Sequence, residues 1–167
     1  MKTLPVAVCI LEHDGRIPLI KFKRNYLAGY WGLPGGKLDD DEHVPDAAVR
    51  ELREELGIET TFERLVATVD EIALDRDGNA TRCILFVCRM RAADAEATAV
   101  STEPRDLPEG LIQWFTPEEI AGMESDFVRS DFRLFLEFGK PKWYGTFRSR
   151  QEWKDGKLQL TYFDRID

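Results

Sequence analysis

The stretch GGKLDDDEHVPDAAVRELREELGI, residues 35–58, decides how this chain is interpreted. Its second half has the composition of a short helix, in which Glu51, Glu54 and Glu55 stand three and four residues apart. Carboxylates at these spacings face one another, and each like-charge pair costs a helix about 0.2–0.5 kcal/mol. A bound cation would relieve this repulsion, and the same repulsion would keep the three carboxylates ready to receive it.

The helix predicted within this stretch has two distinct faces. Pro45 suits the first helical position, Asp46 complements the helix dipole there, and Gly57 is a natural C-terminal stop. The three glutamates form a stripe beside an apolar stripe made of Ala48, Val49, Leu52 and Leu56. A solvated, charge-patterned face is the alternative interpretation. It is disfavoured because the acids cluster at the edge of the apolar stripe instead of alternating with Arg50 and Arg53.

A glycine-containing segment, Leu33-Pro34-Gly35-Gly36, leads into this helix. Glycines let backbone carbonyl groups approach a ligand closely. Three carboxylates and a carbonyl are hard oxygen ligands, the set that Mg²⁺ or Mn²⁺ prefers. The sequence therefore predicts a Mg²⁺ site here, with Mn²⁺ as a substitute.

The composition narrows the class of protein. The chain has 167 residues, of which 43% are hydrophobic and 32% charged, as expected for one globular domain with a modest extension. The net charge of −8 argues against a nucleic-acid-coating or membrane-surface protein, but a bound divalent cation would still admit phosphate-bearing small molecules. Neither a signal peptide nor a membrane-spanning run is evident, and the three cysteines fit buried reduced thiols, so we expect a cytoplasmic protein.

Outside the acidic helix, the pattern predicts a mixed α/β domain. We expect Leu4–Glu12 and Pro18–Arg24 to pair around an Asp14-Gly15 turn, and a second hairpin to have Asp77-Gly78 at its tip. A polar loop is expected at residues 91–110, followed by a strand at residues 111–115 and a helix start at Thr116.

The last part of the chain combines an amphipathic helix with an aromatic tail. The helix is expected within residues 125–138 and ends at Gly139, and the tail alternates about Asp155-Gly156 as a hairpin. We therefore predict a domain at residues 1–139 and a hairpin extension at residues 140–167. The extension would pack on its own domain or on a partner subunit, which leaves a homodimer open; a lid over the substrate is the functional alternative.

A longer spacing pattern identifies a family. From Gly36 the chain reads Gly, five residues, Glu42, seven residues, then Arg50-Glu51-Leu52, one residue, Glu54-Glu55, one residue, Gly57-Ile58. Every specified position of the Nudix box is filled, so the chain resembles the Nudix hydrolases. The resemblance implies a mixed β-sheet sandwiched between helices, to which the C-terminal hairpin is added. It also implies hydrolysis of a nucleoside diphosphate linked to another group, by attack of water on phosphorus.

The resemblance also implies roles for individual residues. Glu51, Glu54 and Glu55 would bind divalent ions together with the Gly35 carbonyl. Arg50 would orient the glutamates and Glu42 would hold the loop, while Gly36 and Gly57 are structural positions of the motif. The general base is one of the glutamates or another acid on a loop, and Glu51 is favoured.

One departure from the family pattern concerns the ligand outside the box. Many relatives carry a glutamate near the strand before the second helix, where this chain has Gln113. Glu109 on the preceding loop could substitute, and so could Glu103. The fourth ligand and the number of metal ions therefore stay open.

The substrate is predicted only as a class, a nucleoside triphosphate or a nucleoside diphosphate linked to a sugar or similar group. Lys23, Arg24 and Lys37 are candidates for a phosphate contact, and Tyr30 is one for base stacking. Tyr26, Trp31 and Trp114 are further stacking candidates.

Two other functions are weighed against this one. Hydrolysis at RNA 5′ ends is disfavoured by the acidic net charge. A non-catalytic nucleotide sensor is disfavoured because no box residue is altered. Neither membrane nor nucleic-acid partners are expected.

Overall fold

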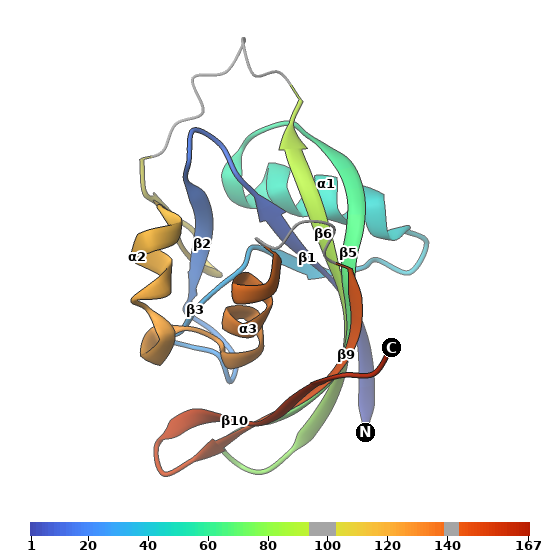
Figure 1. Cartoon of the computed structure of the whole chain (residues 1–167), viewed down its shortest axis with the longest axis vertical. Helices are drawn as coiled ribbons and strands as arrows, with labels where there is room; N and C mark the ends of the chain where they lie inside the picture. The colour runs from blue at the N-terminus through green and yellow to red at the C-terminus, as the bar shows by residue number, and fades with distance from the viewer. Residues whose placement is uncertain (94–102, 139–143) are drawn as a thin grey trace.

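The computed structural model describes residues 1–93, 103–138 and 144–167, which form two β-sheets and three α-helices (Figure 1). The larger sheet has the strand order β10-β9-β5-β6-β1-β4, and the smaller one β3-β2-β8-β7. The strands of the larger sheet are β1 (Lys2–Leu11), β4 (Gly35–Lys37), β5 (Thr60–Leu74), β6 (Ala80–Ala92), β9 (Gly145–Lys154) and β10 (Lys157–Arg165). Those of the smaller sheet are β2 (Ile17–Phe22), β3 (Trp31–Gly32), β7 (Arg105–Asp106) and β8 (Gly110–Phe115). The predicted mixed α/β class is confirmed.

The predicted pairing of the first two strands is wrong. β1 pairs with β6 in parallel and with β4 antiparallel, whereas β2 pairs with β3 and β8 in the other sheet. A single bridge between His13 and Arg16 joins the two strands at the turn. The reason lies in β1 itself, because its residues 7–11 are all buried. A strand buried on both faces is expected in the interior of a sheet whose two faces are both covered, and not in a two-stranded hairpin with one solvent-exposed face.

The two other predicted hairpins are present. β5 and β6 pair antiparallel around a turn in which Gly78 has φ 80°. β9 and β10 pair antiparallel around Asp155 (φ 52°) and Gly156 (φ 75°), the two positive φ values of a tight two-residue hairpin turn. β9 also pairs in parallel with β5, so the C-terminal hairpin continues the larger sheet.

Three helices complete the described chain, α1 (Val44–Leu56), α2 (Pro117–Ala121) and α3 (Arg129–Phe138). α2 begins as predicted, with a capping box in which Thr116 and Glu119 bond each other's backbone N–H groups. α3 begins after an extended residue, Phe127, that follows a short 3₁₀ turn. The predicted end of this helix at Gly139 and residues 94–102 of the predicted polar loop lie outside the described residues. Among the described helices, none has the length and apolar character that a membrane span needs.

Alternate residues of β1 contribute to two hydrophobic cores. Ala7 and Cys9 pack with Leu52 of α1, whereas Val8 and Ile10 belong to the core that contains Phe132 of α3. In Figure 1, α1 and α3 accordingly lie on opposite sides of the larger sheet. The predicted burial of the three cysteines is confirmed, since all are free thiols in buried positions.

Candidate active site

Helix α1 presents the three glutamates from a well-defined position. Its cap residue, His43, makes no side-chain capping bond, and its end is set by Gly57, which has φ 69° and donates its N–H to the Arg53 carbonyl. The helix is held on the sheet by buried apolar residues, among them Leu52. Glu55 is buried on the same side, with 4% of its surface exposed, whereas Glu54 is half exposed. The three carboxylates therefore range from deeply buried to accessible.

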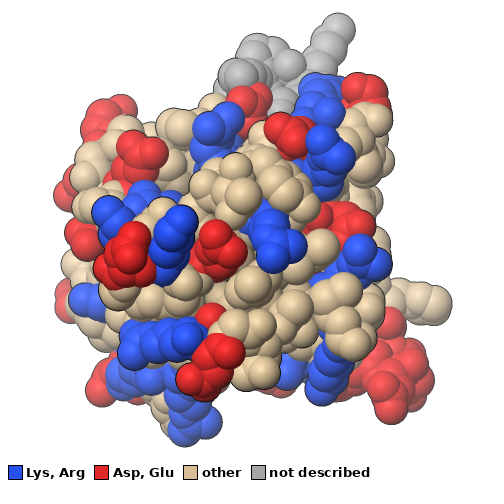
Figure 2. All heavy atoms as spheres, turned by 90° about the horizontal axis from the view of Figure 1, so that it is seen from below, with Lys and Arg blue, Asp and Glu red and all other residues tan. Residues whose placement is uncertain are grey.

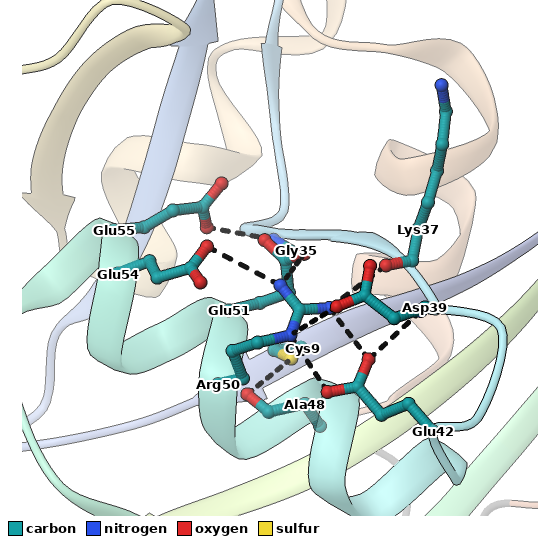
Figure 3. Close-up of polar contacts among 10 residues, drawn as sticks. All are labelled: Cys9, Gly35, Lys37, Asp39, Glu42, Ala48, Arg50, Glu51, Glu54 and Glu55. Carbon is teal, nitrogen blue, oxygen red and sulfur yellow. Dashed lines mark hydrogen bonds and ion pairs between the residues drawn. The ribbon is translucent and has the colours of Figure 1, made fainter.

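Arg50 connects the glutamates to the loop before the helix. Its guanidinium donates two hydrogen bonds of 2.8 Å to Glu42, one of 2.7 Å to Glu51 and one of 3.4 Å to Glu54. A further bond of 3.0 Å reaches the Lys37 carbonyl. Figure 3 shows the guanidinium lying between these acceptors. One planar, permanently charged group thus fixes three carboxylates and one backbone carbonyl.

The glycine loop approaches the cluster closely at two points, at Gly35 against the backbone and at Gly36 against the Glu51 side chain. The Gly35 N–H donates a hydrogen bond of 3.0 Å to Glu55, and a Cβ at Gly35 would lie 2.0 Å from the Ala7 carbonyl oxygen. A Cβ at Gly36 would lie 2.4 Å from a Glu51 carboxylate oxygen. The observed contact of Gly35 with the cluster is made by its N–H. The carbonyl contact with a metal stays a prediction.

The electrostatics show how closely the carboxylates are grouped. Burial raises the pKa of Glu55 well above its usual range, and the neighbouring charges of Glu51, Glu109 and Glu54 raise it further. Burial also raises the pKa of Glu51, against the opposing effect of Arg50. Glu109 therefore lies close enough to act on Glu55, although it belongs to a distant part of the sequence.

The donor set fits a divalent cation. All four side chains offer carboxylate oxygens, the hard ligands that Mg²⁺ and Mn²⁺ prefer, and the mutual repulsion among them is what a cation would relieve. Within the described ranges, no three His, Cys, Asp or Glu side chains already converge on one point as a metal site. Glu51 and Glu54 are instead bonded to Arg50. Gln113, where an acid was expected, lies on β8 opposite Leu19 of β2.

The basic candidates have different surroundings. Lys23 forms an ion pair with Asp106 and donates to the Leu107 carbonyl, so its charge is already engaged. Arg24 is exposed and makes no hydrogen bond or ion pair with a described residue. Lys37 is also exposed; it adjoins the cavity described below, and its carbonyl is bonded to Arg50.

The aromatic candidates are mostly used in packing. The Tyr30 hydroxyl accepts the Leu158 N–H at 2.9 Å, and its ring meets Trp153 edge-on, so it anchors the C-terminal hairpin. Trp31 packs edge-on against Phe115, and Trp114 is buried in the core. Tyr26 is the stacking candidate that lines a cavity.

That cavity, which we call the inner cavity, has a volume of about 220 Å³. Its walls are largely apolar, with Leu4, Val6, Val8, Leu33 and Leu85 among them. Residues 35–37 of β4, which carry the glycine loop, form part of its lining, and the same loop contacts Glu51 and Glu55. It is smaller than the usual pocket for a drug-sized ligand, and its apolar walls suit one planar ring system.

Three buried polar side chains of the inner cavity were not predicted from the sequence, namely Glu71, Asp131 and Gln151. Glu71 is 3% exposed and accepts hydrogen bonds of 2.9 Å from Ser149 and Gln151. Asp131 is 7% exposed and accepts the Leu33 N–H at 3.0 Å. A signal was present for both acids. Glu71 occupies an inward position of β5 between Val69 and Ala73, and Asp131 lies on the apolar face of α3.

Burial changes the acidity of this group. It raises the pKa of Asp131 to about 7, in spite of the Leu33 hydrogen bond and with a further contribution from the charge of Glu71. Burial also raises the pKa of Glu71, while its hydrogen bonds oppose that shift. Acidic side chains with shifted pKa values that line a cavity near potential metal ligands are typical of a functional site.

The comparison with known families agrees with this geometry. The family profile described as the NUDIX domain matches residues 1–138. The chain belongs to the Nudix family. The matched segment contains the glutamate helix, the glycine loop and α3, whereas the C-terminal hairpin lies beyond it.

Individual relatives cover the chain to different extents. A CTP pyrophosphohydrolase of Escherichia coli (strain K12) is 46% identical over 69 residues, 41% of this chain and 51% of that protein. The alignment thus spans about half the length of that relative. YvcI, an uncharacterized Nudix hydrolase of Bacillus subtilis (strain 168), is 28% identical over 149 residues, 89% of each protein. The crystal structure of a mutator MutT protein from Bacillus halodurans matches with a TM-score of 0.66 at 20% identity and covers 97% of both chains, which shows the shared fold.

Proposed function

We propose that this Nudix protein is a Mg²⁺-dependent pyrophosphohydrolase of small nucleotides, acting on a nucleoside triphosphate or on a nucleoside diphosphate linked to another group. The observation that carries the proposal is the position of the glutamate cluster. The carboxylates of Glu51 and Glu55 contact the glycine loop, and the same loop lines the inner cavity. A base in the cavity would therefore place its phosphates near the carboxylates.

The cation would be held by Glu51, Glu54 and Glu55, with the Gly35 carbonyl and Glu109 as further ligands. When bound, a divalent ion neutralises the charge of the diphosphate and makes water a nucleophile at neutral pH. Arg50 and the Gly35 N–H hold Glu51 and Glu55 in place before the substrate arrives. Glu51 remains our candidate for the group that takes a proton from the attacking water.

Among the basic residues, Lys37 is the best placed for a phosphate contact. It lies on β4 between the inner cavity and the Arg50 network. Its charge is accessible, whereas the charge of Lys23 is paired with Asp106. Arg24 is a second candidate, because it is exposed and unpaired among the described residues.

The two other functions are less well supported. An RNA 5′-end hydrolase needs an extended basic surface. Figure 2 shows one face of the protein, on which Lys and Arg side chains are interspersed with Asp and Glu. A non-catalytic sensor would have no need for the full set of box glutamates, all of which are present and bonded in the arrangement described.

The test is product release from a panel of nucleotides with Mg²⁺, comparing the wild type with Glu54→Gln. The panel comprises nucleoside triphosphates, oxidised ones, nucleotide sugars, ADP-ribose and dinucleoside polyphosphates. CTP belongs in it because of the E. coli relative. Glu12→Gln is the matched control, since Glu12 is exposed and lies outside the box.

We expect turnover of one nucleotide class that falls by at least about a hundredfold in Glu54→Gln and is unchanged in Glu12→Gln. Omission of Mg²⁺ should abolish the turnover. If no member of the panel is hydrolysed while a nucleotide still raises the melting temperature, the sensor function replaces the hydrolase.

A further inference from the structure

The polar end of the inner cavity is organised by a carboxylate. Glu71 accepts hydrogen bonds from the Ser149 hydroxyl and from Nε2 of Gln151, both at 2.9 Å. An ionised carboxylate can only accept, and the Gln151 amide accordingly directs its Nε2 toward Glu71 and its Oε1 away from it. Glu71 thus fixes which end of the amide is free.

The free end of Gln151 lacks a partner. Gln151 is fully buried, and its Oε1 has no partner at hydrogen-bond geometry among the described residues. A side-chain hydrogen bond from Gln151 lowers the pKa of Tyr26 against the larger opposing effect of burial, but the Tyr26 hydroxyl is not a partner of Oε1. A buried amide oxygen without a partner is costly, and folded proteins almost always satisfy such groups. Since Gln151 lines the cavity, a ligand that donates a hydrogen bond would supply the partner.

Asp131 adds a second group to the same cavity from α3. Its Oδ2 accepts the Leu33 N–H, and its side chain lines the cavity. Gln151 Oε1 is an acceptor only, whereas a carboxyl group can accept when ionised and donate when protonated. The fixed requirement on a ligand is therefore a donor opposite Gln151.

We propose that Gln151, oriented by Glu71, is a specificity-determining residue that selects nucleobases carrying an exocyclic amino group. The inference rests on the proposed function, in that the inner cavity receives the base of the substrate. An amino group of cytosine, adenine or guanine would donate to Gln151 Oε1, and Asp131 would bond the adjacent ring nitrogen. Uracil, thymine and hypoxanthine would instead bring a carbonyl oxygen, or no polar group, to that position.

The expected discrimination follows from leaving a buried acceptor unpaired. A site built around a hydrogen bond rejects an analogue that lacks it, and the loss of one such bond corresponds to about tenfold to hundredfold in kcat/KM. The comparison uses pairs of nucleotides whose bases match in size, namely CTP with UTP, ATP with ITP and GTP with ITP. We expect the best substrate to carry an amino group and its amino-free partner to be at least about tenfold poorer.

Two substitutions test the residues. Gln151→Met keeps the size of the side chain but removes Oε1. The ratio of kcat/KM between a nucleotide with an amino group and its amino-free partner should therefore fall to below about threefold. In Glu71→Gln the neighbouring amide can donate as well as accept, so Gln151 is free to rotate and the ratio should fall as well. Gln159→Met is the matched control, because Gln159 bonds the Lys154 carbonyl on the same hairpin and does not line the inner cavity. Its ratio should equal that of the wild type.

Binding of the nucleoside monophosphates by calorimetry gives a second readout that requires no hydrolysis. CMP should bind at least about tenfold more tightly than UMP, or AMP or GMP more tightly than IMP, and Gln151→Met should remove the difference. The proposal is overturned if the preferred base lacks an amino group, if paired nucleotides differ by less than threefold, or if Gln151→Met leaves the preference intact. Loss of turnover in Glu54→Gln is independent of these ratios, so failure of the hydrolase proposal and failure of this one are distinguishable.

Discussion

The substitution Asp131→Asn should make the protein more stable at pH 8 and change how its stability depends on pH. Burial raises the pKa of Asp131 from its ordinary value of 3.8 to about 7 in the folded state. Between pH 3.8 and pH 7, the carboxyl group is therefore protonated in the folded state and ionised in the unfolded state. Stability from the protonated carboxyl is fully present below pH 3.8 and is lost as the pH rises through 7.

The magnitude follows from the size of the shift. At about 1.4 kcal/mol per pKa unit, the difference between 3.8 and about 7 corresponds to about 4 kcal/mol at full ionisation. Asparagine is neutral at every pH and keeps an oxygen that can accept the Leu33 N–H. Between pH 5 and pH 8, the free energy of unfolding of the wild type should therefore fall by about 3 kcal/mol relative to Asp131→Asn.

The assay is urea unfolding of both proteins at pH 5, 6, 7 and 8, with Asp126→Asn as the control at an exposed aspartate. Titration of Glu71 and of the box glutamates is common to all three proteins and cancels to a first approximation in the differences between them. The free energies of unfolding of the wild type and the control should show the same dependence on pH. Their difference from Asp131→Asn should grow up to about pH 7 and change little above it. Parallel curves for the wild type and Asp131→Asn would refute the reasoning.

Three further outcomes are expected. Gly36→Ala would place a Cβ 2.4 Å from Glu51, so steady-state kinetics should show a turnover number at least about tenfold lower with the fold retained. Tyr30→Phe removes the acceptor of the Leu158 N–H and should lower the free energy of unfolding in urea by about 1 kcal/mol. Deletion of residues 144–167 removes β9 from beside β5 and should abolish cooperative thermal unfolding monitored by circular dichroism; a melt like that of the full chain would contradict this.

The glutamate helix was predictable because its determinants are local. Pro45, the glutamate spacing and Gly57 lie within one short segment, and each acts through the geometry of a single helix. The hairpin turns at Gly78 and Gly156 were predictable for the same reason, since two-residue turns with positive φ have a strong sequence signature. The family resemblance, carried by the box spacing, agrees with the profile match over residues 1–138.

Strand pairing was not predictable at the same level. The turn at Asp14-Gly15 has the sequence of a hairpin, and the chain does reverse there, yet β1 and β2 enter different sheets. Their partners, β6 and β8, are distant in sequence, and the choice between local and distant pairing depends on which faces become buried. The sequence signal for a central strand is the run of five apolar residues at positions 7–11, all of which are buried in the structure.

The inner cavity could not be assembled from the sequence, because Glu71, Asp131 and Gln151 come from three segments that only the fold brings together. Each acid could have been noticed singly, as a charge at an inward position of a strand or helix. An isolated buried acid has many structural explanations, however. Only the hydrogen bonds from β9 show that Glu71 orients an amide toward a cavity instead of merely filling a gap in the core.

This division of the chain bears on how function can be transferred from relatives. The glutamates, Arg50 and the glycine loop lie in the segment that the family profile covers, whereas Gln151 lies on the hairpin beyond it. The alignment with the E. coli CTP pyrophosphohydrolase covers 41% of this chain. The proposed catalytic residues and the proposed base-selecting residue therefore lie in different segments, and the pairing of β9 with β5 brings the second segment into the larger sheet. Similarity over the box supports the reaction type, while the choice of base must be measured on this protein, with its hairpin in place.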